Sequence, residues 1–152
     1  MHPAIARSPK GDVFYWNIDG PVGLNGTNKF DDVLFVQWCF YKLGKWDRIK
    51  PDLRAICDRT PINGECSGRE GDPLIDIIRA LQRSQAGLKV DGQVTPPPKK
   101  DAQYTHHGSR HTYLIFYLNA ALRYLHPTQY PRIDLMPEFI WKVRDKATSP
   151  FI

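Results

Sequence analysis

The chain has 152 residues, of which 41% are apolar, 12% aromatic and 24% charged, and its formal net charge is +5. Aromatic and aliphatic residues in this proportion can build a buried core, so the composition excludes a disordered chain and predicts one globular domain. The longest uninterrupted apolar run, Tyr113 to Leu118, has six residues. Because a membrane-spanning helix needs ~20, an integral membrane protein is excluded as well.

The N-terminal segment, residues 1–21, combines prolines and glycines with scattered aromatic residues. Proline and glycine interrupt regular secondary structure, so we expect an irregular arm. Its apolar anchors either pack on the body of the protein or pair as a short strand; they are Val13, Tyr15 and Ile18.

The first helix is predicted over residues 31–44, where apolar residues recur at spacings of three and four. These residues are Val33, Val36, Phe40 and Leu43. Asp31 or Asp32 is expected to accept hydrogen bonds from the free N–H groups at the helix start. Gly44 is expected to end the helix in a left-handed turn.

A second helix is predicted over residues 73–86. Asp72 is its expected cap, and Pro73 suits the first helical position, where the missing N–H costs nothing. The segment before it, residues 45–71, is rich in proline and glycine and is predicted to be a loop, with one helical turn from Leu53 to Cys57.

The remaining chain predicts a connector and two further helices. Residues 96–100 read Pro-Pro-Pro-Lys-Lys, which is typical of a stiff, exposed linker. A third helix is expected to start at Ser109 or Thr112 and to end at Leu125. A fourth, shorter helix is predicted from Pro137, carrying Phe139, Ile140 and Val143.

The three main helices share a pattern in which two core residues precede a carboxamide. A carboxamide at this place lies beside the apolar stripe, where it can bond the backbone of a neighbouring loop. We therefore predict a structural role for all three, and not a binding role. The three motifs are Val33-x-x-Val36-Gln37, Ile78-x-x-Leu81-Gln82 and Ile115-x-x-Leu118-Asn119.

Charge is unevenly distributed along the chain. Residues 1–98 hold 13 Lys/Arg and 12 Asp/Glu, whereas residues 99–152 hold 8 and 4. The basic final third would favour an anionic partner, such as nucleic acid, a membrane surface, a cell wall or an acidic protein, but on charge alone a solubilising surface is the favoured interpretation. No Lys/Arg run exceeds two residues, which argues against nucleic acid.

The three cysteines and the N-terminus bear on the compartment. Cys39, Cys57 and Cys66 are odd in number and have no zinc-type spacing, which favours reduced thiols over a disulfide between the last two. The segment from Met1 to Arg7 has no apolar core, so we expect synthesis in the cytoplasm without a secretory signal peptide.

Two stretches of the sequence resemble the peptidoglycan-binding-like domain family, whose pattern places a D-V-x-x-V-Q helix, an L-G ending, an x-x-F-Q helix and a D-G turn in this order. The first stretch comprises Val22-Gly23-Leu24-Asn25, Asn28, Asp32-Val33-x-x-Val36-Gln37 and Leu43-Gly44. The second comprises Ile77-Ile78-x-x-Leu81-Gln82, Gly87-Leu88, Val90-Asp91-Gly92-x-Val94 and Pro96.

The resemblance implies a mainly α fold, a three-helix peptidoglycan-binding-like bundle over residues 22–125. Residues 1–21 and 126–152 would be extensions, the second with a short helix. It further implies a non-enzymatic module that binds peptidoglycan, as muropeptide or wall glycan, and acts with a secreted effector or a contractile injection machine that delivers it to the periplasm. The alternative is an adaptor or structural protein of a type VI secretion or phage-tail assembly, which binds a protein through the same fold.

The sequence departs from the family pattern at several places. The first D-G turn is Asn63-Gly64 here, after a much longer connection, and Leu81 stands where the family often has phenylalanine. About twenty residues separate Asp91-Gly92 from the third helix, and the tail 126–152 has no counterpart. These departures leave open that a wall-binding groove has been replaced by protein contacts.

Catalytic and metal-ligating residues are not predicted. His107 and His111 have a metal-ligand spacing on a helix, but Gly108 and Ser109 lie between them and no acidic ligand is near, so an exposed loop is the favoured interpretation of the His106–His111 cluster. None of the three cysteines has a recognisable nucleophile context. We therefore expect no enzyme activity, no metal and no cofactor.

Two sets of residues are candidates for binding. Asp91, Gln93, Tyr104 and Arg110 lie near the Asp-Gly turn and combine an aromatic face for sugars with an arginine for stem-peptide carboxylates. A structural Asp-Gly turn in a solvated loop is the alternative for them. Trp38 and Tyr41 lie off the apolar stripe of the first helix and form a candidate protein-docking pair, unless one of the chain ends covers them.

Overall fold

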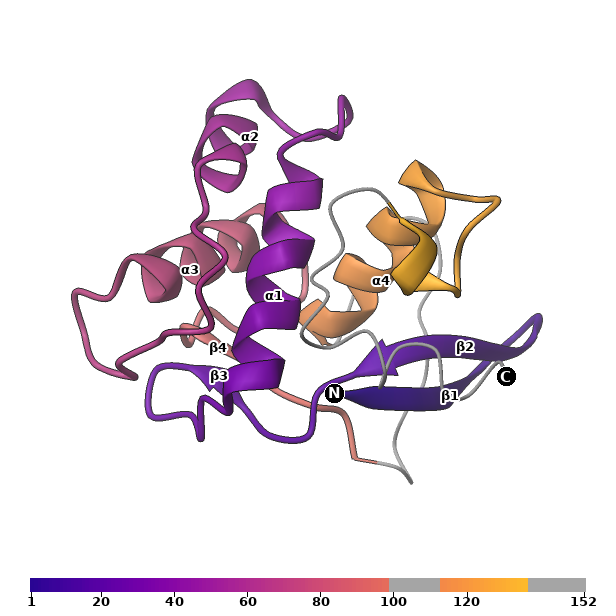
Figure 1. Cartoon of the computed structure of the whole chain (residues 1–152), viewed down its shortest axis with the longest axis horizontal. Coiled ribbons are helices and arrows are strands. Elements are labelled where there is room, and N and C mark those ends of the chain that lie inside the picture. The colour runs from indigo at the N-terminus through magenta and orange to yellow at the C-terminus, as the bar shows by residue number, and fades with distance from the viewer. Residues whose placement is uncertain (99–112, 137–152) are drawn as a thin grey trace.

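The computed structural model describes residues 1–98 and 113–136, which form a long hairpin, four helices and a small second ribbon (Figure 1). The strands are β1 (His2–Ser8), β2 (Gly11–Asn17), β3 (Val22–Gly23) and β4 (Gln93–Val94). The helices are α1 (Phe30–Leu43), α2 (Pro51–Asp58), α3 (Pro73–Ser84) and α4 (Leu114–Leu125), followed by a 3-10 turn at Ile133–Leu135.

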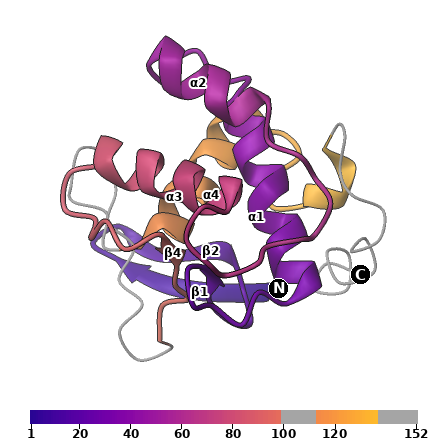
Figure 2. The ribbon, with the colours of Figure 1, turned by 90° about the vertical axis from the view of Figure 1, so that its left-hand side faces the viewer.

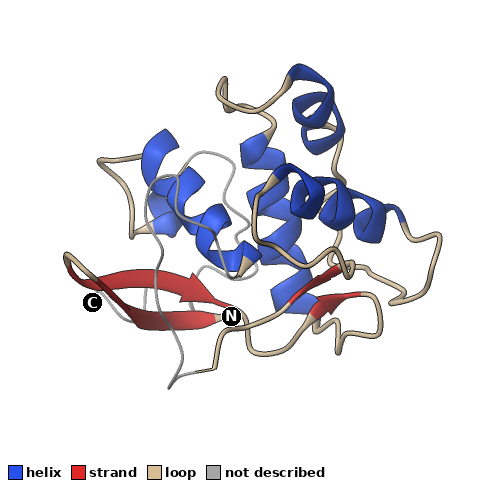
Figure 3. Ribbon diagram, turned by 180° about the vertical axis from the view of Figure 1, so that it is seen from behind, coloured by secondary structure: helices blue, strands red, loops and turns tan. Residues whose placement is uncertain are grey.

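Both pairs of strands lie on one side of the molecule and the helices lie on the other (Figures 1 and 3). β1 pairs antiparallel with β2, and β3 pairs antiparallel with β4. The helix α2 lies farthest from the hairpin (Figure 2). The prediction of a mainly α, three-helix bundle is therefore wrong, because the described residues form a mixed architecture of helices and two small antiparallel sheets.

The arm predicted to be irregular is the β1–β2 hairpin. Its strands pair from His2↔Asn17 to Ser8↔Gly11, across a two-residue turn. Pro3 is tolerated because it lies opposite Trp16, whose backbone N–H and C=O face away from β1 and bond the Asn119 side chain instead. The two strands of the hairpin thus pair with each other, and β2 is in addition hydrogen-bonded to α4.

The helix α1 lies at the centre of the core, with every residue from Asp32 to Phe40 buried. Because neighbouring elements cover α1 on all sides, the residues that lie off its predicted apolar stripe are buried as well. Gly44 follows it, as predicted, but with right-handed φ and ψ of −58° and −19°. What requires glycine there is space, because an added Cβ would lie 2.5 Å from Asp58 Cα.

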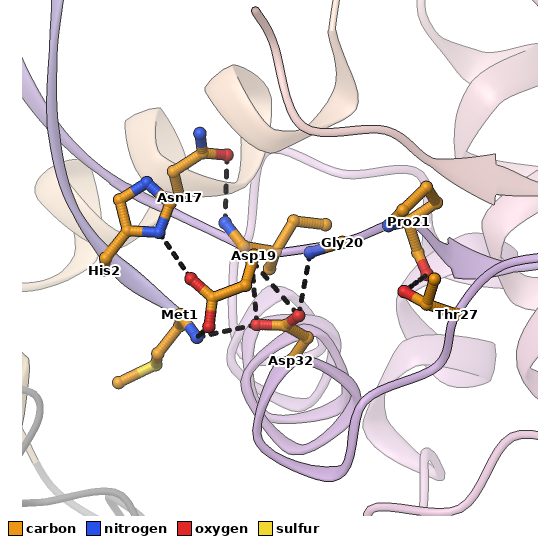
Figure 4. A network of polar contacts seen from close by, with 9 residues as sticks. Met1, His2, Asn17, Asp19, Gly20, Pro21, Thr27 and Asp32 are labelled. Atoms are coloured by element: carbon orange, nitrogen blue, oxygen red, sulfur yellow. Dashed lines mark hydrogen bonds and ion pairs between the residues drawn. The ribbon is translucent and has the colours of Figure 1, made fainter. Parts of the chain in front are cut away.

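The predicted cap of α1 has a different role. Asp32 is fully buried and binds the Met1 ammonium at 2.7 Å, together with the N–H groups of Asp19 and Gly20 (Figure 4). Asp19 binds the same ammonium at 2.9 Å and His2 Nδ1 at 2.6 Å. Burial raises the pKa of Asp19, but these hydrogen bonds outweigh it and lower the pKa to about 2. The network fixes the start of β1 against α1.

The other predicted helices agree more closely with the structure. The α3 helix covers most of 73–86, and α4 ends at Leu125 as predicted, although it starts at Leu114 rather than at Ser109 or Thr112. The single turn predicted from Leu53 to Cys57 is part of a longer helix, because α2 extends from Pro51 to Asp58. The predicted fourth helix lies outside the described residues. None of the helices in residues 1–98 and 113–136 has the length and apolar character needed to cross a membrane.

Candidate functional site

The Gln37 side chain of α1 locks the turn at Asn63-Gly64. Its Oε1 accepts the N–H groups of Asn63 at 3.0 Å and Gly64 at 2.8 Å. Its Nε2 donates to Asn63 Oδ1 at 2.9 Å and to the Glu65 carbonyl at 3.2 Å. All four hydrogen-bonding positions of the amide are therefore used within the fold.

The Gln82 side chain of α3 locks the Asp91-Gly92 turn with the same four bonds. Its Oε1 accepts the N–H groups of Asp91 at 3.1 Å and Gly92 at 2.9 Å. Its Nε2 donates to Asp91 Oδ1 at 2.8 Å and to the Gln93 carbonyl at 3.0 Å. The two turns are equivalent bond for bond, although 26 residues separate glutamine and turn in the first and 9 in the second.

The packing around the two turns is equivalent too. Gly64 and Gly92 have φ of +75° and +73°, a region that glycine adopts at no steric cost. A Cβ on Gly64 would collide with the ring of Phe30, and one on Gly92 would lie 3.0 Å from Ile75 Cγ2. Both of these side chains stand seven residues before the glutamine of their own helix. The two helix-and-turn units are thus an internal structural repeat.

The third carboxamide, Asn119 of α4, bonds a strand instead of a turn. Its Oδ1 accepts the Trp16 N–H at 2.7 Å and its Nδ2 donates to the Trp16 carbonyl at 2.8 Å. It also accepts a hydrogen bond from the Tyr130 hydroxyl. The prediction that all three carboxamides have structural roles is confirmed.

A pocket of about 550 Å³ lies between α1, the loop at 60–67 and the start of α3. This volume falls within the ~300–1,000 Å³ of ligand pockets. Its polar lining includes Thr60, Asn63, Glu65, Ser67 and Asp72. Its apolar lining includes Pro61, Cys66, Pro73, Leu74 and Ile77.

One polar group of this pocket lacks a partner. Thr60 is 5% exposed, and its Oγ1 has no hydrogen-bond partner among the residues that the structure describes. The oxygen itself is inaccessible to solvent, so Thr60 lines the pocket with its other atoms and the hydroxyl lies behind the pocket surface. The evidence for a binding site is therefore the volume and the lining of the pocket.

The predicted binding residues are only partly brought together. Asp91 and Gln93 lie side by side, but the Asp91 carboxylate accepts a hydrogen bond from Gln82 Nε2. The Gln93 side chain bonds the Leu24 carbonyl and the Thr95 hydroxyl. Their side chains thus have structural partners, in keeping with the alternative of a structural turn. Tyr104 and Arg110, like the His106–His111 cluster, lie outside the described residues.

The predicted docking pair is not formed. Trp38 is 0% exposed and lies beside Phe35, because α1 is surrounded by other elements on all sides. Tyr41 is partly exposed, with the Lys45 ammonium 4.8 Å from its ring centroid. The prediction of a Trp38–Tyr41 docking patch is therefore wrong for Trp38.

The thiols are free and their environment disfavours a nucleophile. Cys39 and Cys57 are buried, and burial raises the pKa of Cys57 to about 12. Cys66 is partly exposed in the pocket; burial raises its pKa, although N–H groups of Gly68 and Gly23 act in the opposite direction. No described histidine lines the pocket, and no three His, Cys, Asp or Glu of the described residues are grouped to hold a metal ion.

Sequence reasoning missed the pocket because its walls come from three separate segments. The Asn63-Gly64 turn was the available signal, since it is the counterpart of the Asp91-Gly92 turn. No protein-family model, curated protein or solved structure matches this chain significantly.

Asp72 caps α3 and also lines the pocket, which allows a stability prediction. Its Oδ1 accepts the Leu74 N–H at 2.9 Å, so Asp72→Ala is expected to cost about 1 kcal/mol at pH 7. Burial raises the Asp72 pKa, but hydrogen bonds from Ser67, Leu74 and Ile75 outweigh it and lower the pKa. The stabilisation of the folded state by the Asp72 carboxylate is thus fully present above its ordinary pKa of 3.8. It is lost as the pH falls through the lower pKa that Asp72 has in the folded protein.

Urea unfolding of wild type and variant between pH 7 and pH 2 measures this difference. The exposed Asp76 lies in the same first turn without a cap bond, so Asp76→Ala is the matched control. A cost for Asp72→Ala that stays constant down to pH 2 would contradict the assignment.

Proposed function

We propose that this protein is a non-enzymatic binding module for peptidoglycan, and that the pocket between α1, the loop at 60–67 and α3 receives the stem peptide. The observation that carries the proposal is the pocket itself, whose lining combines polar and apolar groups with a thiol that has no histidine of the described residues beside it. Such a lining suits recognition, because nucleophilic catalysis needs an activated nucleophile. The sequence resemblance supplies the class of ligand.

The two locked turns support the same proposal. The Asp91-Gly92 turn lies in a stretch that resembles wall-binding domains, and Asn63-Gly64, which lines the pocket, stands in place of the first D-G turn of the family. Each turn is held rigidly by a buried glutamine. A rigid turn preorganises the pocket wall, which lowers the entropic cost of binding. Association with a secreted effector or an injection machine, and delivery to the periplasm by it, rest on the resemblance alone.

Co-sedimentation with purified sacculi tests the proposal. We expect the full chain to sediment with sacculi and Ser67→Trp, which fills the pocket from its exposed rim, to bind at least tenfold more weakly. Ser84→Trp places the same side chain at the far end of α3 and should bind like wild type. Absence of wild-type sedimentation, or equal binding by Ser67→Trp, would overturn the proposal and favour the adaptor function.

A further inference from the structure

The pocket is negatively charged although the protein carries a net charge of +5. Glu65 and Asp72 contribute two carboxylates to its lining, and no Lys, Arg or His of the described residues lines it. Lys29 and Arg59 are the direct sequence neighbours of the lining residues Asn28 and Thr60, but they do not belong to the lining. Charge complementarity therefore favours a cationic ligand group.

The start of α3 offers no competing site for an anion. Pro73 has no N–H, and the Leu74 N–H is bonded to Asp72 Oδ1 at 2.9 Å. The N–H groups of Ile75 and Asp76 are bonded to the Asp72 carbonyl. A helix N-terminus binds anions through free N–H groups, and here these groups are already used.

Asp72 keeps its charge in the pocket wall. Its Oδ2 accepts the Ser67 N–H at 2.7 Å, and the hydrogen bonds that it receives lower its pKa against the effect of burial. Each carboxylate oxygen can accept more than one hydrogen bond, so an ammonium group can still bind there. Glu65 is exposed and lines the same pocket.

The remaining lining fits the rest of an amino-acid residue. Leu74 and Ile77, together with two prolines, give the pocket an apolar wall along which a methylene chain can lie. The Asn63 Oδ1 accepts hydrogen bonds from Gln37 Nε2 and from the Glu65 N–H. The Asn63 Nδ2 is therefore the end of the amide that can donate to a peptide carbonyl of the ligand.

We propose that the pocket binds an aliphatic side chain ending in an ammonium group, that is, the diamino-acid residue of a peptide. This inference rests on the proposed function, in which the peptide is the wall stem peptide. The apolar wall takes the methylene chain, Glu65 and Asp72 bind the ammonium, and Asn63 binds the backbone of the ligand.

Calorimetric titration of the full chain with small probes tests this assignment. We expect Nα-acetyl-lysine amide to bind and the norleucine and Nε-acetyl-lysine analogues to bind at least tenfold more weakly. Glu65→Gln should weaken lysine-amide binding about tenfold, which corresponds to one charge-assisted hydrogen bond. Glu70→Gln is the matched control, since Glu70 lies outside the pocket lining. Equal binding of the norleucine analogue, or no effect of Glu65→Gln, would overturn the inference.

Sacculi whose free amines have been acetylated separate this inference from the proposed function. Sedimentation with native sacculi but not with acetylated ones supports both. Equal sedimentation with native and acetylated sacculi supports wall binding and overturns the ammonium site. Selective lysine-amide binding without sedimentation supports the ammonium site and overturns wall binding.

Discussion

Asn119→Leu is expected to destabilise the protein by about 4 kcal/mol. The substitution keeps the branched shape and heavy-atom count of a fully buried side chain but removes four hydrogen bonds, to the Trp16 N–H and carbonyl, the Ile115 carbonyl and the Tyr130 hydroxyl. Removing one partner of a buried polar group costs about 1–3 kcal/mol per group, and two backbone groups of β2 lose their Asn119 partner here. The midpoint of urea unfolding measures the loss.

The Asn119 experiment needs a control from the same region. Gln129→Leu is suitable, because the Gln129 side chain is partly exposed and its only hydrogen-bond partner in the described part of the chain is the neighbouring Thr128 hydroxyl. It should change stability by less than about 0.5 kcal/mol. If Asn119→Leu were equally mild, the carboxamide would not be what holds the hairpin on α4.

Features set by local sequence were predictable. The apolar spacing located α1 and α3, and Asp72-Pro73 marked the start of α3 because a cap and a first-turn proline act within a few residues. The carboxamide motif indicated its function as well, since a glutamine beside a buried stripe must find partners nearby. In each case the determining contacts lie on one helix or at its edge.

Features set by distant contacts were not predictable. The hairpin contains Pro3 and Pro9 and looked irregular, yet its β2 edge is bonded by Asn119, more than a hundred residues away. Asp32 looked like a helix cap, but the Met1 ammonium, which only the folded hairpin brings near, is its partner. Trp38 looked exposed because the helix pattern gives no sign of how many elements surround α1.

The candidate site was predictable from the sequence only in part. The Asn63-Gly64 turn was visible in the sequence as the counterpart of Asp91-Gly92, but the pocket beside it was not. Its walls require Thr60 and Ile77 to approach each other, which depends on how α2 and α3 pack. Sequence therefore identified one wall of the pocket, and the fold supplied the others.

Gln37→Leu and Gln82→Leu are expected to destabilise the protein equally, by about 3 kcal/mol each. Each substitution removes the same four bonds, and in each the N–H of a buried glycine loses its acceptor, Gly64 in one case and Gly92 in the other. Urea unfolding measures both losses, with Gln85→Leu as a control whose amide reaches only the neighbouring Ser84 hydroxyl in the described structure. Costs that differ by more than about 1 kcal/mol would contradict the equivalence of the two turns.

The same two variants separate stability from ligand binding. The turn locked by Gln37 lines the pocket, whereas the turn locked by Gln82 does not. We therefore expect Gln37→Leu to weaken the binding of Nα-acetyl-lysine amide about tenfold and Gln82→Leu to leave it unchanged, measured at a temperature at which both variants are folded. Because the two variants lose the same stability, a general loosening of the fold would weaken both alike. Equal weakening would mean that the locked turn at Asn63-Gly64 is not part of the binding site.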